Sequence, residues 1–199
     1  MNVKFFVSPG SQVTTTINPQ NIVPLPDLNR AIKVMLSNRD CATFVENLIN
    51  KVAERTKISF IADYLPDLLD NVQVDFSQQY MRDGTPIAGK APPRDAAGIA
   101  HLGISPRSAK GLTEIGYKNA VYTYAETYLH ELIHYAGGTR RYTDQELAEA
   151  AVALGNLPEG AKKWFDQIKP GDIKGYSDFY DSILQNHCPG PLGKPQFPK

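Results

Sequence analysis

The chain has 199 residues, of which 42% are hydrophobic, so it can form one domain with a packed core and is too apolar for wholesale disorder. Lys plus Arg and Asp plus Glu number 21 each, which leaves no basic excess of the kind that binds nucleic acids or anionic membranes. No apolar run approaches the roughly 18 to 20 residues that cross a bilayer. We therefore expect neither a nucleic-acid partner nor a membrane partner.

The first residues, MNVKFFVSPGSQ, contain only a very short apolar stretch. A signal peptide needs an apolar region of about 7 to 15 residues, so none is expected here. An exported protein whose signal has been removed would look the same, and the sequence therefore leaves the compartment open, export included.

The N-terminal half reads as a mixture of strands and helices. Residues 1–26 alternate apolar residues with Thr and Ser, which predicts one or two short strands and an extended lead-in. A short helix is expected to begin at Asp27, and Asp40 is expected to cap a second helix at 40–56. Residues 57–76 are ambiguous and end in a predicted strand at 72–76. The Gly- and Pro-rich residues 82–96 predict an ordered loop, and AGIAHLGIS (97–105) predicts a strand.

The C-terminal half reads as helical. A long helix is predicted at about 112–136, with Gly137 and Gly138 as its stop signal. Residues 143–155 predict a second strong helix, and 158–168 and 177–187 predict two more. The last twelve residues contain four prolines, so we expect a loosely held tail at 188–199 after a single domain at 1–187.

Two cysteines lie at opposite ends of the chain, Cys41 and Cys188. Cys41 falls in a predicted amphipathic helix, where we expect a small buried side chain rather than a bonded one. The alternative is a disulfide with Cys188, which would tie the C-terminal segment to the N-terminal helices and indicate an oxidising compartment.

The residues that carry chemistry are His130-Glu131-Leu132-Ile133-His134, near the end of the long helix. Side chains four residues apart lie on one face of a helix, so the two histidines can bind one metal ion, and neutral imidazole suits zinc. Glu131 stands about 100 degrees round the helix, beside the metal, where a carboxylate can serve as general base for a water molecule. The spacing predicts a site for one zinc ion.

This H-E-x-x-H motif resembles that of the zincin metallopeptidases, over about residues 112–151 of the chain. The resemblance implies an α+β fold in which a small mixed N-terminal part, with a short sheet, packs on a long active-site helix and is followed by a helical half. It also implies hydrolysis of a peptide or protein substrate, with Glu131 as the base.

The third ligand distinguishes the branches of that clan. The metzincin position falls at Arg140, and no Met follows the motif, so that branch does not fit. The thermolysin-like branch needs a Glu where residues 153–155 are Ala-Leu-Gly. GGTRRYTD loosely resembles the Gly-Thr-x-x-Asp segment of the aspzincins, with a longer spacing and without the Tyr-Gly that should follow.

That resemblance favours Asp144 as the third ligand. Thr143 and Glu146 form a predicted capping box, which occupies Glu146 at the start of its helix. Glu146 itself, Glu149, and His101 or His187 remain alternatives.

Acyl transfer also needs a group that stabilises the oxyanion, and Tyr142 is our candidate, with Tyr135, Arg140 and Arg141 as alternatives. Zincins usually hold an extended substrate along an edge strand, for which GIAHLGI is the candidate.

The sequence therefore predicts a zinc metallopeptidase. Two alternatives keep the fold but change the function: a zinc hydrolase of a non-peptide amide or a toxin-type effector, and a zincin-like scaffold that binds without catalysis. Intact Glu131 argues against the last, because a structural zinc site needs no base.

Overall fold

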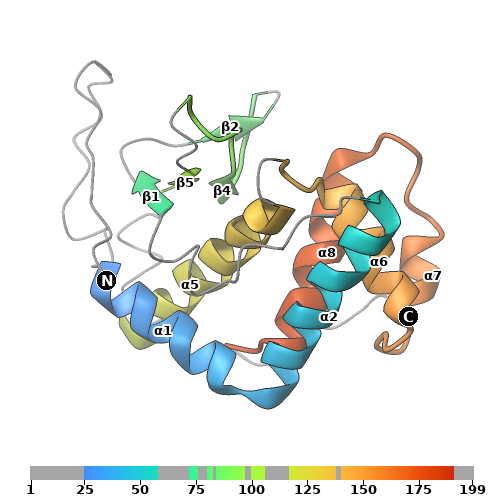
Figure 1. Ribbon diagram of the computed structural model, residues 1–199, viewed down its shortest axis with the longest axis horizontal. Coiled ribbons are helices and arrows are strands. Elements are labelled where there is room, and N and C mark those ends of the chain that lie inside the picture. Colours follow the sequence, from blue (N-terminus) through green and yellow to red (C-terminus); the bar gives the residue numbers. More distant parts are fainter. Residues whose placement is uncertain are drawn as a thin grey trace.

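A computed structural model describes residues 25–57, 72–75, 80–82, 84–96, 100–105, 117–137 and 140–190. Within these ranges the chain is mixed α/β and mostly helical (Figure 1). The strands predicted before residue 25, most of the ambiguous segment 57–71 and the first five residues of the predicted long helix lie outside the described residues.

Two helices open the described chain, α1 (Leu25–Ser37) and α2 (Arg39–Thr56). The prediction that Asp40 caps α2 is wrong by two positions. Asn38 is the cap, because it has an extended backbone and its side chain accepts a hydrogen bond from the Asp40 amide at 2.9 Å. Asp40 lies instead in the first turn, where a carboxylate favourably faces the positive end of the helix.

The sheet is small and has three described strands in the order β1-β5-β4. β1 (Val72–Asp75) runs parallel to β5 (Ala100–Ile104), and β4 (Gly89–Lys90) runs antiparallel to β5. β2 (Met81–Arg82) and β3 (Thr85–Pro86) form a separate antiparallel pair. The segment 82–96, predicted as loop, therefore contributes short strands to both sheets.

The strand predicted at 97–105 is present as β5, but its predicted place at the edge of the sheet is wrong. β5 pairs on one side with β1 and on the other with β4, so it is the central strand. Among the described strands, β4 is the edge nearest α5. The sequence could not reveal this, because the two-residue strand at 89–90 is too short to produce a periodic pattern.

The helix of the motif, α5 (Tyr117–Ile133), ends earlier than predicted and continues as a 3-10 turn at His134–Gly137. The carbonyl of His134 accepts a hydrogen bond from the Tyr142 amide at 2.8 Å. The ring of Tyr142 lies against Gly137, where a Cβ would be only 3.1 Å from two ring carbons. The chain therefore turns back sharply after the second histidine.

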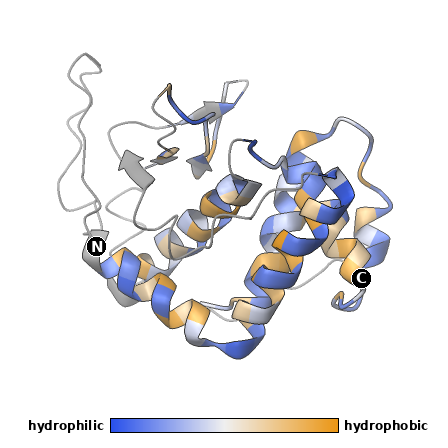
Figure 2. Ribbon diagram, viewed as in Figure 1, coloured by the Kyte–Doolittle hydropathy of each residue, from blue (hydrophilic) through white to orange (hydrophobic). Residues whose placement is uncertain are grey.

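Three helices complete the fold, α6 (Asp144–Leu154), α7 (Ala161–Phe165) and α8 (Ile173–His187). α5 contacts β4 and β5 on one side and α1 and α8 elsewhere, while α2, α6 and α8 pack on one another (Figure 1). The apolar faces of these helices point into a common core, with polar faces outward (Figure 2). None of the described helices combines the length and the apolar character needed to cross a membrane.

Cys41 and Cys188 form a disulfide that joins the first turn of α2 to the end of α8, across 147 positions of sequence. Both residues are buried. This corrects the expectation of an unbonded Cys41. Of the tail predicted at 188–199, residues 191–199 lie outside the described residues. Cys188 is fixed by the bond, and the Gly190 amide donates to Glu126 Oε1 at 3.1 Å, so the chain is held at least to Gly190.

We predict that replacing both cysteines, Cys41→Ser with Cys188→Ser, lowers the free energy of unfolding by about 2 to 5 kcal/mol, because the bond closes a long loop in the unfolded chain. Urea unfolding with and without reductant measures the difference. Wild-type protein denatured without reductant should show no thiol that reacts with an alkylating agent. Equal stability of the variant and the unreduced wild type would contradict the prediction.

Candidate metal centre

Three donor atoms from two helix ends converge on one point. Nε2 of His130 and Nε2 of His134 lie 3.2 and 3.4 Å from Oδ1 of Asp144. When one ligand atom is taken from each of the three residues, these three atoms lie within 4.8 Å of one another. Their exposed fractions are 6%, 6% and 8%, so the group is buried and can hold a metal ion.

The local sequence explains this convergence. His130 and His134 are one turn apart at the end of α5, so their rings face the same side, with centroids 5.2 Å apart. The reversal at Gly137 returns the chain to them, and α6 begins at Asp144. Thr143 caps that helix in the predicted capping box, which fixes the direction of its first turn and hence of Asp144.

Each histidine is also held by its other ring nitrogen. Nδ1 of His134 lies 2.7 Å from the carbonyl oxygen of Tyr142, and Nδ1 of His130 lies 3.2 Å from Oδ1 of Asp181. A carbonyl and a carboxylate can only accept, so both Nδ1 atoms carry protons and Nε2 is the atom each ring presents to a metal. Metal-bound histidines show this second contact almost always, so the residues present fit a metal ion.

Asp181 is a member of the site that the sequence did not indicate. It lies on α8, 51 positions from His130, and its other oxygen accepts from the Gln185 amide at 3.4 Å. The preceding Tyr180 is fully buried and packs its ring against that of His130, with centroids 4.6 Å apart. No motif spacing connects α8 to α5, so only the packing of the two helices could reveal this carboxylate.

Burial and hydrogen bonding shift the pKa values of the group in opposite directions. Burial lowers the pKa of His130, but the carboxylates of Asp144 and Asp181 outweigh it and raise the pKa well above its usual value. Burial raises the pKa of Asp144, but hydrogen bonds from His130 and His134 reverse the effect and hold that pKa well below its usual range. Without a metal, Asp144 is therefore ionised and His130 carries a second proton, which a bound metal ion would have to displace.

Glu131 lies beside the group and not within it. Its exposed fraction is 8%, and burial raises its pKa against the lowering effect of the imidazoles of His130 and His134. It rests against β4 at Gly89, where a Cβ would lie 2.7 Å from Glu131 Oε1 and 2.8 Å from Cγ2 of Thr127. Glycine at position 89 thus leaves room for the carboxylate at the edge of the sheet.

The other candidates for the third ligand lie elsewhere. Glu146 closes the capping box and pairs with Arg140, and Glu149 pairs with Arg55 at 2.7 Å. His101 lies 2.7 Å from Asp95, and His187 stacks on Phe44. Asp144 is the carboxylate that the structure brings to the two histidines.

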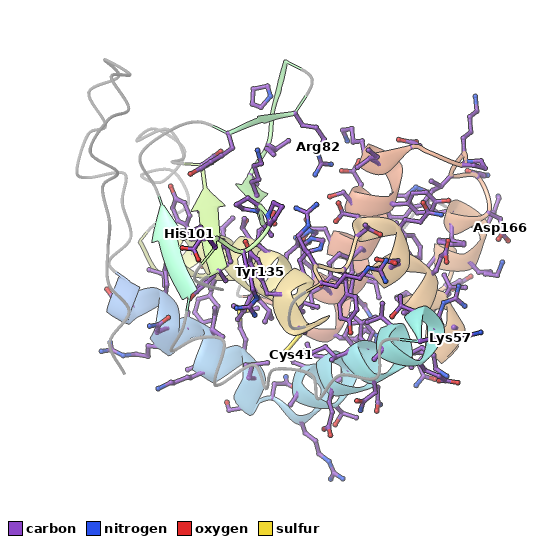
Figure 3. The ribbon with its side chains drawn as sticks, turned by 45° about the horizontal axis from the view of Figure 1, so that its top comes forward. Cys41, Lys57, Arg82, His101, Tyr135 and Asp166 are labelled. Carbon is purple, nitrogen blue, oxygen red and sulfur yellow. A yellow bond between two sulfur atoms is a disulfide. The ribbon has the colours of Figure 1, made fainter. Side chains whose placement is uncertain are left out.

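The residues proposed to stabilise an oxyanion are dispersed. Tyr142 is 1% exposed and contributes its carbonyl to His134, while its ring packs on Gly137. The hydroxyl of Tyr135 lies within hydrogen-bond distance of the carbonyls of Pro92 and His101 (Figure 3). Arg140 pairs with Glu146, and Arg141 donates to the Ala91 carbonyl. A catalytic role for Tyr142 stays a prediction.

A cleft passes over the centre in two adjoining halves. The His130 half is a cavity of about 550 Å³ and the His134 half one of about 530 Å³. Both are lined by Glu131, Arg82 and Ile87, and by Gly171 and Ile173 at the start of α8. Arg82 lies between the small strands and the C-terminal helices (Figure 3), with Nη2 3.7 Å from Asp144 Oδ2. Glu131 therefore faces a space large enough for a substrate from both sides.

Comparisons of the chain with protein-family models, with curated proteins and with solved structures found no match. The resemblance to the zincins thus rests on residues 130–134 and on the surroundings of that motif. Any functional conclusion has to come from the geometry of the site.

We predict that the protein binds one zinc ion and that Asp144→Ala weakens the affinity by orders of magnitude, because it removes the carboxylate shared by both histidines. Glu149→Ala is the matched control, because this carboxylate lies on the same helix and pairs with Arg55 instead, so zinc affinity should stay unchanged. Competition with a chromophoric chelator measures both affinities. Unchanged affinity in Asp144→Ala would exclude it as a ligand.

Asp181→Asn should lower zinc affinity by about 10- to 100-fold, because it weakens the acceptor that orients the ring of His130. Asp178→Asn is the control, as this carboxylate lies on the same helix and contacts Lys174 instead. Both variants can be titrated with the same chelator. Equal affinities of the two variants would show that the contact between Asp181 and His130 does not support the metal.

Proposed function

We propose that this chain is a zinc metallopeptidase of the zincin type. His130, His134 and Asp144 are its ligands, and Glu131 is its general base. The observation that carries the proposal is the convergence of three buried donor atoms beside Glu131, whose carboxylate lies where the two halves of an open cleft meet.

The donor set favours zinc in a catalytic site. Two imidazoles and one carboxylate are ligands typical of catalytic zinc, whereas structural zinc sites are normally closed by four Cys or His ligands. Three protein ligands leave a coordination position for water or substrate, and the centre borders the cleft. When bound, a zinc ion would lower the pKa of a coordinated water molecule toward about 7 and polarise a substrate carbonyl.

The protein's own residues then perform the proton transfers. A carboxylate oxygen of Glu131 accepts the proton of the attacking water and delivers it to the amide nitrogen that leaves. The close approach of the Gly89 backbone restricts the position of Glu131, which lines the cleft. Asp181 and the Tyr142 carbonyl keep the two imidazoles oriented throughout.

The edge of β4 supports an extended peptide as the substrate. The Ser105 amide donates to the Ala88 carbonyl at 2.8 Å, so Ala88 faces β5 with its backbone groups. In an antiparallel pair the next residue faces the other way, so the N–H and C=O of Gly89 point away from β5, on the cleft side. An extended chain can add to such an edge by backbone hydrogen bonds.

Glu131 also separates this proposal from the alternatives. A scaffold that only binds needs no buried carboxylate beside its metal, because burying one without a partner is costly. A hydrolase of a non-peptide amide would use the same residues and would differ in the substrate that fills the cleft. The outer edge of β4 at Gly89, with which no other described strand pairs, is the observation that favours a peptide.

Glu131→Gln should keep one zinc per chain and lower the rate of peptide hydrolysis by at least about 10²- to 10⁴-fold, because the amide cannot accept the proton. Glu46→Gln, an exposed change on α2, is the control and should behave as wild type. The measurements are metal content and cleavage of a mixed peptide library by mass spectrometry. Loss of zinc in Glu131→Gln would make it a ligand and overturn the mechanism, and wild-type hydrolysis by this variant would exclude it as the base.

A further inference from the structure

The His134 half of the cleft carries a surplus of positive charge. Three cationic side chains line it, Arg82, Lys90 and Arg141. Of its two carboxylates, Asp144 belongs to the metal centre and Glu131 lies beside it. A zinc ion would offset the charge of those carboxylates, so the cations of this wall would remain uncompensated.

Two of the three cations have no carboxylate partner among the described residues. Arg82 pairs with Asp144 at 3.7 Å. Arg141 instead donates to the carbonyl of Ala91, a neutral acceptor, and Lys90 is an exposed side chain at the end of β4. Because Ala91 follows Lys90 in the chain, this hydrogen bond also brings the guanidinium of Arg141 close to the backbone that carries Lys90. Both side chains line the same half of the cleft, so a carboxylate bound there would be attracted by two positive charges.

The His130 half has the opposite character. It shares Arg82 and Glu131 with the other half, and Asp172, Asp178 and Asp181 line it in addition. Its further cation, Lys174, pairs with Asp178, so carboxylates outnumber cations on this side. An acidic group would be repelled from this side and attracted to the other. The cleft thus distinguishes its two ends by charge.

We propose that the substrate is a peptide with an acidic side chain close to the cleaved bond, and that Lys90 and Arg141 bind its carboxylate in the His134 half of the cleft. This inference rests on the proposed function, because it places the reacting bond at Glu131 and the metal centre. A guanidinium and an ammonium are the groups that recognise a carboxylate with charge-assisted hydrogen bonds. Arg82 is occupied by Asp144 and orients that ligand instead.

Calorimetric binding to the zinc-loaded protein tests the inference without turnover. The probes are two peptide hydroxamates, which chelate zinc, with either Glu or Gln one or two residues from the chelating group. We expect the Glu probe to bind at least about tenfold more tightly, since the two side chains differ in charge and hardly in shape. Lys90→Gln and Arg141→Gln should each reduce this preference, and the double variant should abolish it. Lys163→Gln, an exposed change on α7, should leave it intact.

Equal affinity of wild type for the two probes would overturn the inference. Arg141→Gln can also disturb the segment at Ala91. In that case the variant would bind both probes more weakly by the same factor. That result would assign Arg141 a structural role and contradict its part in recognition. Arg141→Lys keeps the charge and should retain the preference for Glu.

Cleavage of the peptide library separates the two proposals. Products with an acidic residue at a fixed distance from the cut, lost in the double variant, would support both. A preference for the Glu hydroxamate without any cleavage would refute the peptidase and retain acidic recognition. Cleavage without any preference for acidic residues would support the peptidase and refute acidic recognition. A protein that binds no zinc would refute both proposals.

Discussion

The arrangement of the site depends on two hydrogen bonds between His134 and Tyr142. The Tyr142 amide donates to the His134 carbonyl, and Nδ1 of His134 donates to the Tyr142 carbonyl. The first bond turns the chain back at the end of α5. The second fixes the orientation of the His134 ring. Because α6 starts two residues after Tyr142, the same pair of bonds delivers Asp144 to the histidines. Gly137 permits the close approach of the Tyr142 ring on which this reversal depends.

The helices behind the centre supply its support. α8 contributes Asp181 and the ring of Tyr180 to His130, and it packs on α6, which carries Asp144. The bond between Cys41 and Cys188 joins the far end of α8 to α2, which also packs on α6. The three donor side chains are thus held from several sides by buried structure, which would favour a precise geometry around a metal ion.

The face toward the cleft is built differently. The small strands contribute the edge of β4 at Gly89, which no other described strand pairs with, and the cations Arg82 and Lys90. The start of α8 and the residues before it contribute Ile173 and Gly171. Ile173 is 56% exposed, unusual for so large an apolar side chain, and it stands at the cleft where the two halves adjoin. The helices position the metal-binding side chains, and short, partly exposed segments form the surface that a substrate would contact.

The sequence by itself determined those features that depend on neighbours along the chain. Helical spacing places His130 over His134, and the residues 143 and 146 specify the capping box that starts α6. The stop signal at Gly137 and Gly138, the capping box and the family resemblance together predicted Asp144 as a ligand. The convergence of its carboxylate on both rings is seen only in the structure. Asp181, the disulfide and the position of β4 were decided only by tertiary structure, since each joins segments far apart in sequence. Periodicity records which face of a helix is buried but not which other helix covers it, so contacts between distant elements leave no local pattern to read.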